Sequence, residues 1–186
     1  GMLWTMLNPL LQMIVYALVF STVMRFDVKN YAVFLLVALL PWLFLSQAVS
    51  QSVLSLVTNQ GLIKKIRLPK AVFPLSVVAN LVNFALSLVP LFGLIVYFRI
   101  PLTAAAFFLP VAIMLLAFFA AGLCLLLSGL CTFFRDIQHL TGVFFSVWFF
   151  LTPIIYPESA IPAKYSAFLA WNPMTYLVAC FRDPLF

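Results

Sequence analysis

The feature that most constrains this chain is a series of long apolar runs separated by short charged or prolyl breaks. A membrane-spanning helix needs about 20 consecutive apolar residues, whereas the strands of a membrane β-barrel alternate over segments of about 10. The runs here have helix length, which predicts one all-α integral membrane domain, a polytopic helical bundle with five spans. We place these spans at about residues 2–24, 31–57, 71–98, 103–133 and 137–151.

Composition supports the same class. Hydrophobic residues make up 66% of the chain and charged residues only 8%, whereas a soluble domain carries about 25% charged residues. The net charge of +6 could suit nucleic acid, but the basic residues lie between the apolar runs and form no separate domain. Contacts with the lipid bilayer, through orientation and anionic headgroups, explain these residues better. We therefore expect no nucleic-acid partner.

A basic segment lies between the second and third runs. Lys64, Lys65, Arg67 and Lys70 place four of the ten basic residues within seven positions, with no acid among them. Basic loops between spans are retained on the cytoplasmic side. With this loop inside, the Lys and Arg residues divide five against five between the two sides, so the orientation depends on their clustering. We interpret residues 59–70 as a cytoplasmic coupling loop that receives force from a soluble partner.

Polar side chains recur inside the spans. Those in the third run are spaced i, i+4, i+7 and i+11, which places them on one helical face, and two more lie one turn apart in the first run. Polar groups are costly in hydrocarbon unless they meet water or a partner. They could line a pathway, or they could form interhelical hydrogen bonds worth about 0.6 kcal/mol each. The candidate lining residues are Ser76, Asn80, Asn83, Ser87, Asn8 and Gln12.

Aromatic residues crowd the fifth run. Phe144, Phe145, Trp148, Phe149 and Phe150 occupy most sides of this helix. They could form an aromatic belt at the membrane interface, or some could stack on sugar rings in transit. We include Phe145 and Trp148 among the candidate channel-lining residues.

The last third, residues 154–186, differs from the rest. Its apolar pieces, 160–169 and 174–181, are only ten or so residues long, and prolines interrupt them. Such pieces are too short to span and suit re-entrant helices on the outer side. We propose an outer gate here, with candidate residues Pro157, Pro162, Tyr165, Trp171, Asn172 and Pro173.

Residues that carry chemistry are scarce. The chain has only four acidic residues, and none of them lies within a span. The spans therefore lack the acidic residues that catalysis by paired carboxylates or by a Ser/His/Asp triad requires. No GxxxxGK[ST] phosphate-binding motif and no Cys/His metal spacing occurs. We expect no catalytic, cofactor-binding or metal-ligating residues in this chain, and no ATP hydrolysis by it.

Six sequence blocks occur together in one order. In that order the chain resembles the permease subunits of type-2 ABC exporters, and among them those that move O-antigen, teichoic acid or capsular polysaccharide. The blocks are Leu3–Gln12, Asn30–Trp42, Asn59–Ser76, Phe133–His139, Leu151–Pro157 and Asn172–Asp183.

The resemblance implies a six-span permease of the bacterial plasma (inner) membrane. Such a permease works as a homodimer with two separate ATP-binding-cassette subunits, which bind ATP and Mg. Its N-terminal amphipathic helix and its last span are not among these 186 residues. The implied cargo is a glycan on a polyprenyl-diphosphate lipid, which passes the outward re-entrant gate. The implied coupling helix, which sits on the ATPase, comprises Leu62, Ile63, Lys64, Lys65, Ile66, Arg67, Leu68, Pro69 and Lys70.

Three alternatives stay open at this stage. The first is a type-2 permease for another amphipathic substrate, such as a drug or a lipid. A passive channel would need a selectivity ring of charges or carbonyl groups. A membrane-embedded glycosyl or phosphoryl transferase is opposed by the small number of acids.

Overall fold

All elements of the described chain are helical, which confirms the all-α prediction. The computed structural model describes residues 2–23, 30–65, 69–78, 81–101, 104–161 and 166–185. The longer helices are α1 (Met2–Val23), α2 (Tyr31–Val53), α6 (Leu81–Tyr97), α7 (Leu109–Phe133), α8 (Ile137–Leu151) and α10 (Pro173–Leu185). The shorter elements are α3 (Ser55–Thr58), α4 (Gln60–Lys65), α5 (Val72–Val78), η1 (Ala104–Phe108), η2 (Glu158–Ala160) and α9 (Ser166–Trp171).

Within the described residues, three stretches are long and apolar enough to cross a membrane: Tyr31–Thr58, Val72–Tyr97 and Ala105–Phe133. They coincide closely with the second, third and fourth predicted runs. Shorter apolar helices occur at Leu7–Tyr16, inside α1, and at Ile137–Leu151, which is α8. Fifteen residues of α-helix extend only about 22 Å, so α8 alone is shorter than the hydrocarbon core.

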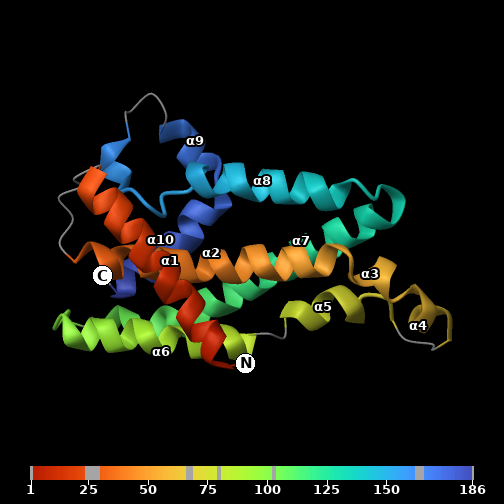
Figure 1. Cartoon of the computed structure of the whole chain (residues 1–186), viewed down its shortest axis with the longest axis horizontal. Coiled ribbons are helices and arrows are strands. Elements are labelled where there is room, and N and C mark those ends of the chain that lie inside the picture. Colours follow the sequence, from red (N-terminus) through yellow and green to blue (C-terminus); the bar gives the residue numbers. More distant parts are fainter. Residues whose placement is uncertain are drawn as a thin grey trace.

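Helix α2 lies at the centre of the bundle (Figure 1). It packs against α1, α5, α6, α7, α8 and α10, and its residues from Tyr31 to Val53 are buried on nearly every side. A helix that is apolar all round belongs in a core. A movement of α2 therefore changes its contacts with most of the other helices.

Small residues mark the contact between α2 and α7. Ala120, Cys124 and Ser128 on α7, and Ser52 on α2, are fully buried, and Cys124 lies in hydrogen-bond contact with Ser52. Small side chains let membrane helices approach closely. These small residues let α2 and α7 pack closely against each other.

Arg99 closes α6 in a conformation that glycine adopts more readily. Its φ of 52° is left-handed, and the amide groups of Arg99 and Ile100 donate to the carbonyl oxygens of Val96 (3.1 Å) and Ile95 (3.0 Å). This pair of bonds is the Schellman cap.

Arg99→Gly is therefore expected to raise the free energy of unfolding by about 1 kcal/mol, because a left-handed non-glycine residue is strained. Detergent-titrated unfolding measures this change. Arg99→Ala keeps the strain and serves as the control. Equal stability of the two variants would contradict the prediction.

Candidate functional site

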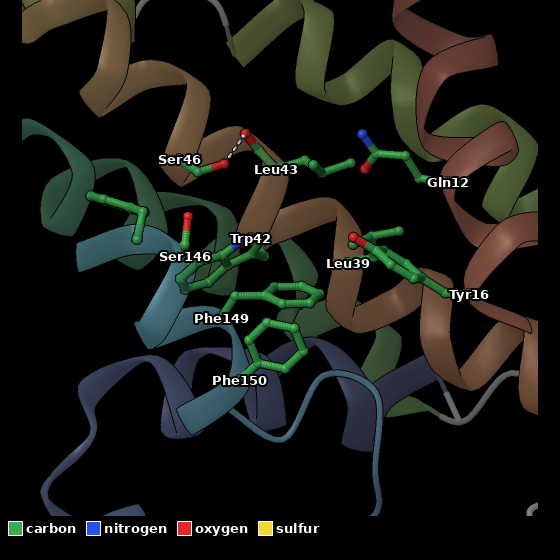
Figure 2. A pocket seen from close by; sticks show the side chains of 10 residues that line it. Gln12, Tyr16, Leu39, Trp42, Leu43, Ser46, Ser146, Phe149 and Phe150 are labelled. Carbon is green, nitrogen blue, oxygen red and sulfur yellow. Dashed lines mark hydrogen bonds between the residues drawn. The ribbon is translucent and has the colours of Figure 1, made fainter. Parts of the chain in front are cut away.

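A groove of about 340 Å³ opens between α1, α2 and α8 (Figure 2). Residues of α1 form one wall, those of α8 form the opposite wall, and α2 forms the floor between them. The lining residues are Gln12, Tyr16, Leu39, Trp42, Leu43, Ser46, Phe145, Ser146, Phe149 and Phe150.

Aromatic rings form a connected wall in this groove. The Trp42 ring centroid lies 5.6 Å from those of Phe145 and Phe149, and Tyr16 on α1 lies 5.8 Å from Phe149. Tilted pairs at such distances stabilise each other by about 0.5–1.5 kcal/mol beyond their buried area. The groove therefore has a stiff aromatic surface built from all three helices.

The polar groups of the groove are neutral. The Ser46 hydroxyl donates to the carbonyl oxygen of Leu43 (3.2 Å), and the Ser146 hydroxyl donates to that of Gly142 (2.9 Å). Each hydroxyl oxygen keeps lone pairs that accept further hydrogen bonds. Gln12 adds an amide, and no charged residue is among the ten that line the groove. This surface combines flat aromatic faces with neutral hydrogen-bonding groups.

The predicted lining residues divide between the groove and its surroundings. Gln12 and Phe145 line the groove, while Asn8 is exposed on α1 one turn earlier. Trp148 lies buried behind the wall, where its indole N–H donates to Asn172 Oδ1 (2.8 Å). Of the lining residues that sequence reasoning missed, Trp42 was visible only as part of a Pro-Trp pair in the second run.

The polar stripe of the third run lies on α5 and α6, away from the groove. Ser76 is exposed and donates to the carbonyl oxygen of Phe73 (2.7 Å), whereas Ser87 is buried and donates to that of Phe84 (2.6 Å). Asn83 is half-buried and Asn80 lies outside the described residues. The lining role of this stripe stays a prediction.

The basic segment contains a helix. Residues 60–65 form α4, of which no residue is buried, and α4 lies at one end of the bundle (Figure 1). Leu62, Lys64 and Lys65 are exposed, and Ile63 is half-buried. Pro69 and Lys70 follow, both exposed, and the predicted coupling residues Ile66, Arg67 and Leu68 lie outside the described residues.

Asn59 joins α4 to the central helix. Its side-chain Nδ2 donates to the carbonyl oxygen of Ser55 (2.7 Å), and its own carbonyl oxygen accepts from the amides of Leu62 (3.0 Å) and Ile63 (2.9 Å). Because α3 follows α2 after Leu54 alone, hydrogen bonds run almost without a gap from α4 into α2. Sequence reasoning assigned Asn59 to the loop and missed this role.

The predicted gate segment lies at the other end of the bundle (Figure 1). Trp171 is 89% exposed at the end of α9, Pro173 is exposed and Pro157 is half-buried. Asn172 separates α9 from α10 and is buried. Pro162 and Tyr165 lie outside the described residues. The two expected short helices correspond to α9 and α10, although α10 extends to Leu185 and includes Pro184.

A half-buried cation near this end was not anticipated. Arg182 on α10 lies with its guanidinium carbon 3.8 Å from the ring centroid of Phe34 on α2. Burial lowers the pKa of the guanidinium to about 10, and Glu158, Asp183 and Tyr31 oppose that shift. The group therefore stays protonated at neutral pH. The only sequence signal was that Phe-Arg-Asp occurs twice, at 134–136 and 181–183.

The described residues contain no group of three or more His, Cys, Asp or Glu side chains that could hold a metal ion. The site therefore offers binding and stacking groups, and the described residues supply no cluster for metal chemistry.

Comparison with known proteins places these features in a family context. Residues 1–186 match the family described as ABC-2 type transporter. The O-antigen export system permease protein RfbA of Myxococcus xanthus is 38% identical over 186 residues, covering 98% of this chain and 71% of the relative. RfbA of Klebsiella pneumoniae is 32% identical over 185 residues, covering 98% and 71%. The polysialic acid transport protein KpsM of Escherichia coli is 24% identical over 189 residues, covering 98% and 72%.

Proposed function

Because this chain belongs to the ABC-2 type transporter family, we propose that it is the permease of an ATP-driven exporter of lipid-linked polysaccharide. The chain is a multi-pass transport subunit of the bacterial inner membrane. Two relatives, each covered to 71% of its length by this chain, are named for O-antigen export, and a third, covered to 72%, is named for polysialic acid transport. A glycan is therefore the cargo class that the relatives favour.

The observation that carries this proposal is the chemistry of the groove between α1, α2 and α8. Sugar rings have apolar faces that stack on aromatic side chains, and hydroxyl groups that need hydrogen-bond partners. Phe150, which is 63% exposed, and the half-buried Tyr16 supply ring faces, with the buried Trp42 and Phe149 packed behind them. Gln12 and Ser146 supply neutral polar groups. None of the ten lining residues carries a charge that would bind a charged group tightly or select ions. Such a surface suits a long hydrophilic chain that must bind weakly at many positions.

Two copies of the chain would enclose the pathway. The groove lies on the surface of a single copy, and exposed apolar residues flank it on α1 and α8, among them Leu11, Ile14, Val147 and Leu151. A second copy facing the first would cover these residues and convert two grooves into one channel. We propose five spans here, with α1 and α8 crossing beside the three longer ones, and a sixth in the full family.

The remaining partners follow from α4. An exposed basic helix at one end of the bundle is a docking site for a soluble subunit, and we propose two ATP-binding-cassette subunits there, one for each copy. They would supply the ATP and Mg site. Movement of α4 would pass through Asn59 to α2, which contacts most of the bundle. The cargo would be a glycan on a polyprenyl-diphosphate lipid, and α9 with α10 would form the outer gate.

Co-purification with the ATP-binding subunit, followed by mass spectrometry of bound lipid, tests this function. We expect a polyprenyl-diphosphate lipid that carries sugars. Recovery of the assembled transporter with a glycan-free lipid or a drug as its only transported ligand would contradict the proposal.

Phe150→Ala is expected to reduce glycan export about tenfold, because the loss of one aromatic stacking face costs about 1–3 kcal/mol where nucleobases stack, and a sugar ring on Phe150 loses a contact of the same kind. Phe150 is 63% exposed, so its loss should hardly affect folding. Transport into inverted membrane vesicles measures the change. Phe118→Ala on α7, where the side chain is 72% exposed and outside the groove, is the matched control. Equal export by both variants would remove the groove from the pathway.

A further inference from the structure

The chain leaves its helical path after α8 and yet stays buried. Thr152 and Ile154 are 0% exposed and Ile155 is 2% exposed, although residues 152–157 form no helix. Backbone carbonyl groups without helical partners are costly away from water. In a membrane protein such backbone persists only where protein or a water-filled cavity satisfies it. This buried break, residues 152–155, therefore needs donors from elsewhere.

Side chains of two other helices supply those donors. Tyr31 at the start of α2 donates to the carbonyl oxygen of Ile155 (2.6 Å). Arg182 Nη2 on α10 donates to the carbonyl oxygens of Pro153 (3.0 Å) and Ile154 (3.4 Å). Asn172, just before α10, donates to that of Leu151 (3.2 Å). The break is thus held from α2 on one side and from α10 on the other.

Arg182 bridges all three parts. It bonds the break and stacks over Phe34 of α2 while it belongs to α10. Arginine suits this position because its planar guanidinium can stack on a ring and donate in its plane at once, whereas a lysine ammonium is a point charge. Its Nε is buried and has no partner among the described residues. Three protein contacts, with the carbonyl oxygens of Pro153 and Ile154 and with the Phe34 ring, hold this half-buried cation in place.

We infer that Arg182 is a positioning residue that joins α10, the break after α8 and the start of α2 into one body. This inference rests on the proposed function, since it concerns how the outer gate opens. If α10 moved away from the break, several buried carbonyl groups would lose their hydrogen-bond donors. The Arg182 guanidinium would lose its acceptors at the same time. Motion of α10 together with the break and the start of α2 keeps all of these contacts. The gate therefore opens by moving with the end of α8 and the start of α2, and α10 does not lift away from them.

A buried reporter cysteine tests whether the joint parts. Ile154→Cys is placed in the full permease with its ATP-binding subunit, with Cys180→Ser removing the exposed native cysteine. A membrane-impermeant maleimide is applied from outside, at rest and during ATP turnover. Trp171→Cys, at an exposed position, shows that the reagent has access. We expect Ile154→Cys to react at least about tenfold more slowly than Trp171→Cys in both states, because a closed joint exposes the thiol only by local opening.

Arg182→Lys tests the residue itself. It keeps the charge but loses the stacking and the planar donors, so the Ile154→Cys reporter should react at least about tenfold faster at rest. Arg99→Lys, an exposed arginine outside the joint, should leave the rate unchanged. An unchanged rate in Arg182→Lys would overturn the role of Arg182. If the Ile154→Cys reporter in the permease with native Arg182 reacted as fast as Trp171→Cys during turnover, the inference that α10, the break and the start of α2 move as one body would be overturned.

The resting measurement uses neither glycan nor ATP. Its outcome therefore stands whether or not the assembled transporter carries polysaccharide. Failure of the proposed cargo would appear in the bound lipid, and failure of the joint would appear in the reactivity of the reporter.

Discussion

Lys64→Glu combined with Lys65→Glu is expected to lower glycan export at least about tenfold, because reversing charges at a docking surface creates like-charge contacts that cost several kcal/mol. The physical reason is the position of α4, which projects from the bundle with both lysines exposed and no buried residue. The variant should still insert, because the apolar spans are unchanged. ATP hydrolysed per glycan exported, measured in inverted vesicles, should rise.

The control for this variant is a charge reversal at the opposite end of the bundle. Arg99→Glu changes an equally exposed cation in the cap of α6 and should leave export unchanged. Wild-type export by the double lysine variant would remove α4 from the coupling mechanism. Loss of the protein from the membrane fraction would show that the lysines act through insertion, and would contradict the prediction too.

Asn172→Ala is expected to lower the free energy of unfolding by about 3 kcal/mol, because it leaves several buried partners without a hydrogen bond. Asn172 Oδ1 accepts from the Trp148 indole (2.8 Å) and the Met174 amide (3.0 Å), and Nδ2 donates to Thr152 Oγ1 (3.0 Å). This one side chain ties α10 to α8. Unfolding in mixed detergent micelles measures the loss.

The matched control is Tyr176→Phe, which removes one exposed bond to the carbonyl oxygen of Ala170 (3.0 Å). It should cost at most about 1 kcal/mol, the net value of a single hydrogen bond. A double-mutant cycle of Asn172→Ala with Trp148→Phe should show a coupling of about 1 kcal/mol or more, since the two side chains are in contact. Additive effects, or a total loss below that of the control, would contradict the role of Asn172.

Local sequence patterns determined where the apolar helical stretches of this protein lie. The run predicted at 137–151 is α8 with the same bounds, because a charged pair precedes it and Thr152-Pro153 follows it. Charge clustering likewise located the exposed basic segment that contains α4. These features depend on residues close together in the chain, namely hydropathy, charge and proline. The order of the six blocks was also sufficient to identify the family, which the comparisons confirm.

Only the tertiary structure decided which face of each helix has which role. Nothing in the sequence singled out α2 as the central helix, or separated Phe150 in the groove from Trp148 behind its wall. The bonds from Arg182 to the break and from Asn59 to α4 join groups whose geometry no spacing rule predicts. The physical reason is that lipid tails are as apolar as leucine. Hydropathy therefore separates a span from a loop, but it cannot separate the side of a span that faces lipid from the side that faces protein.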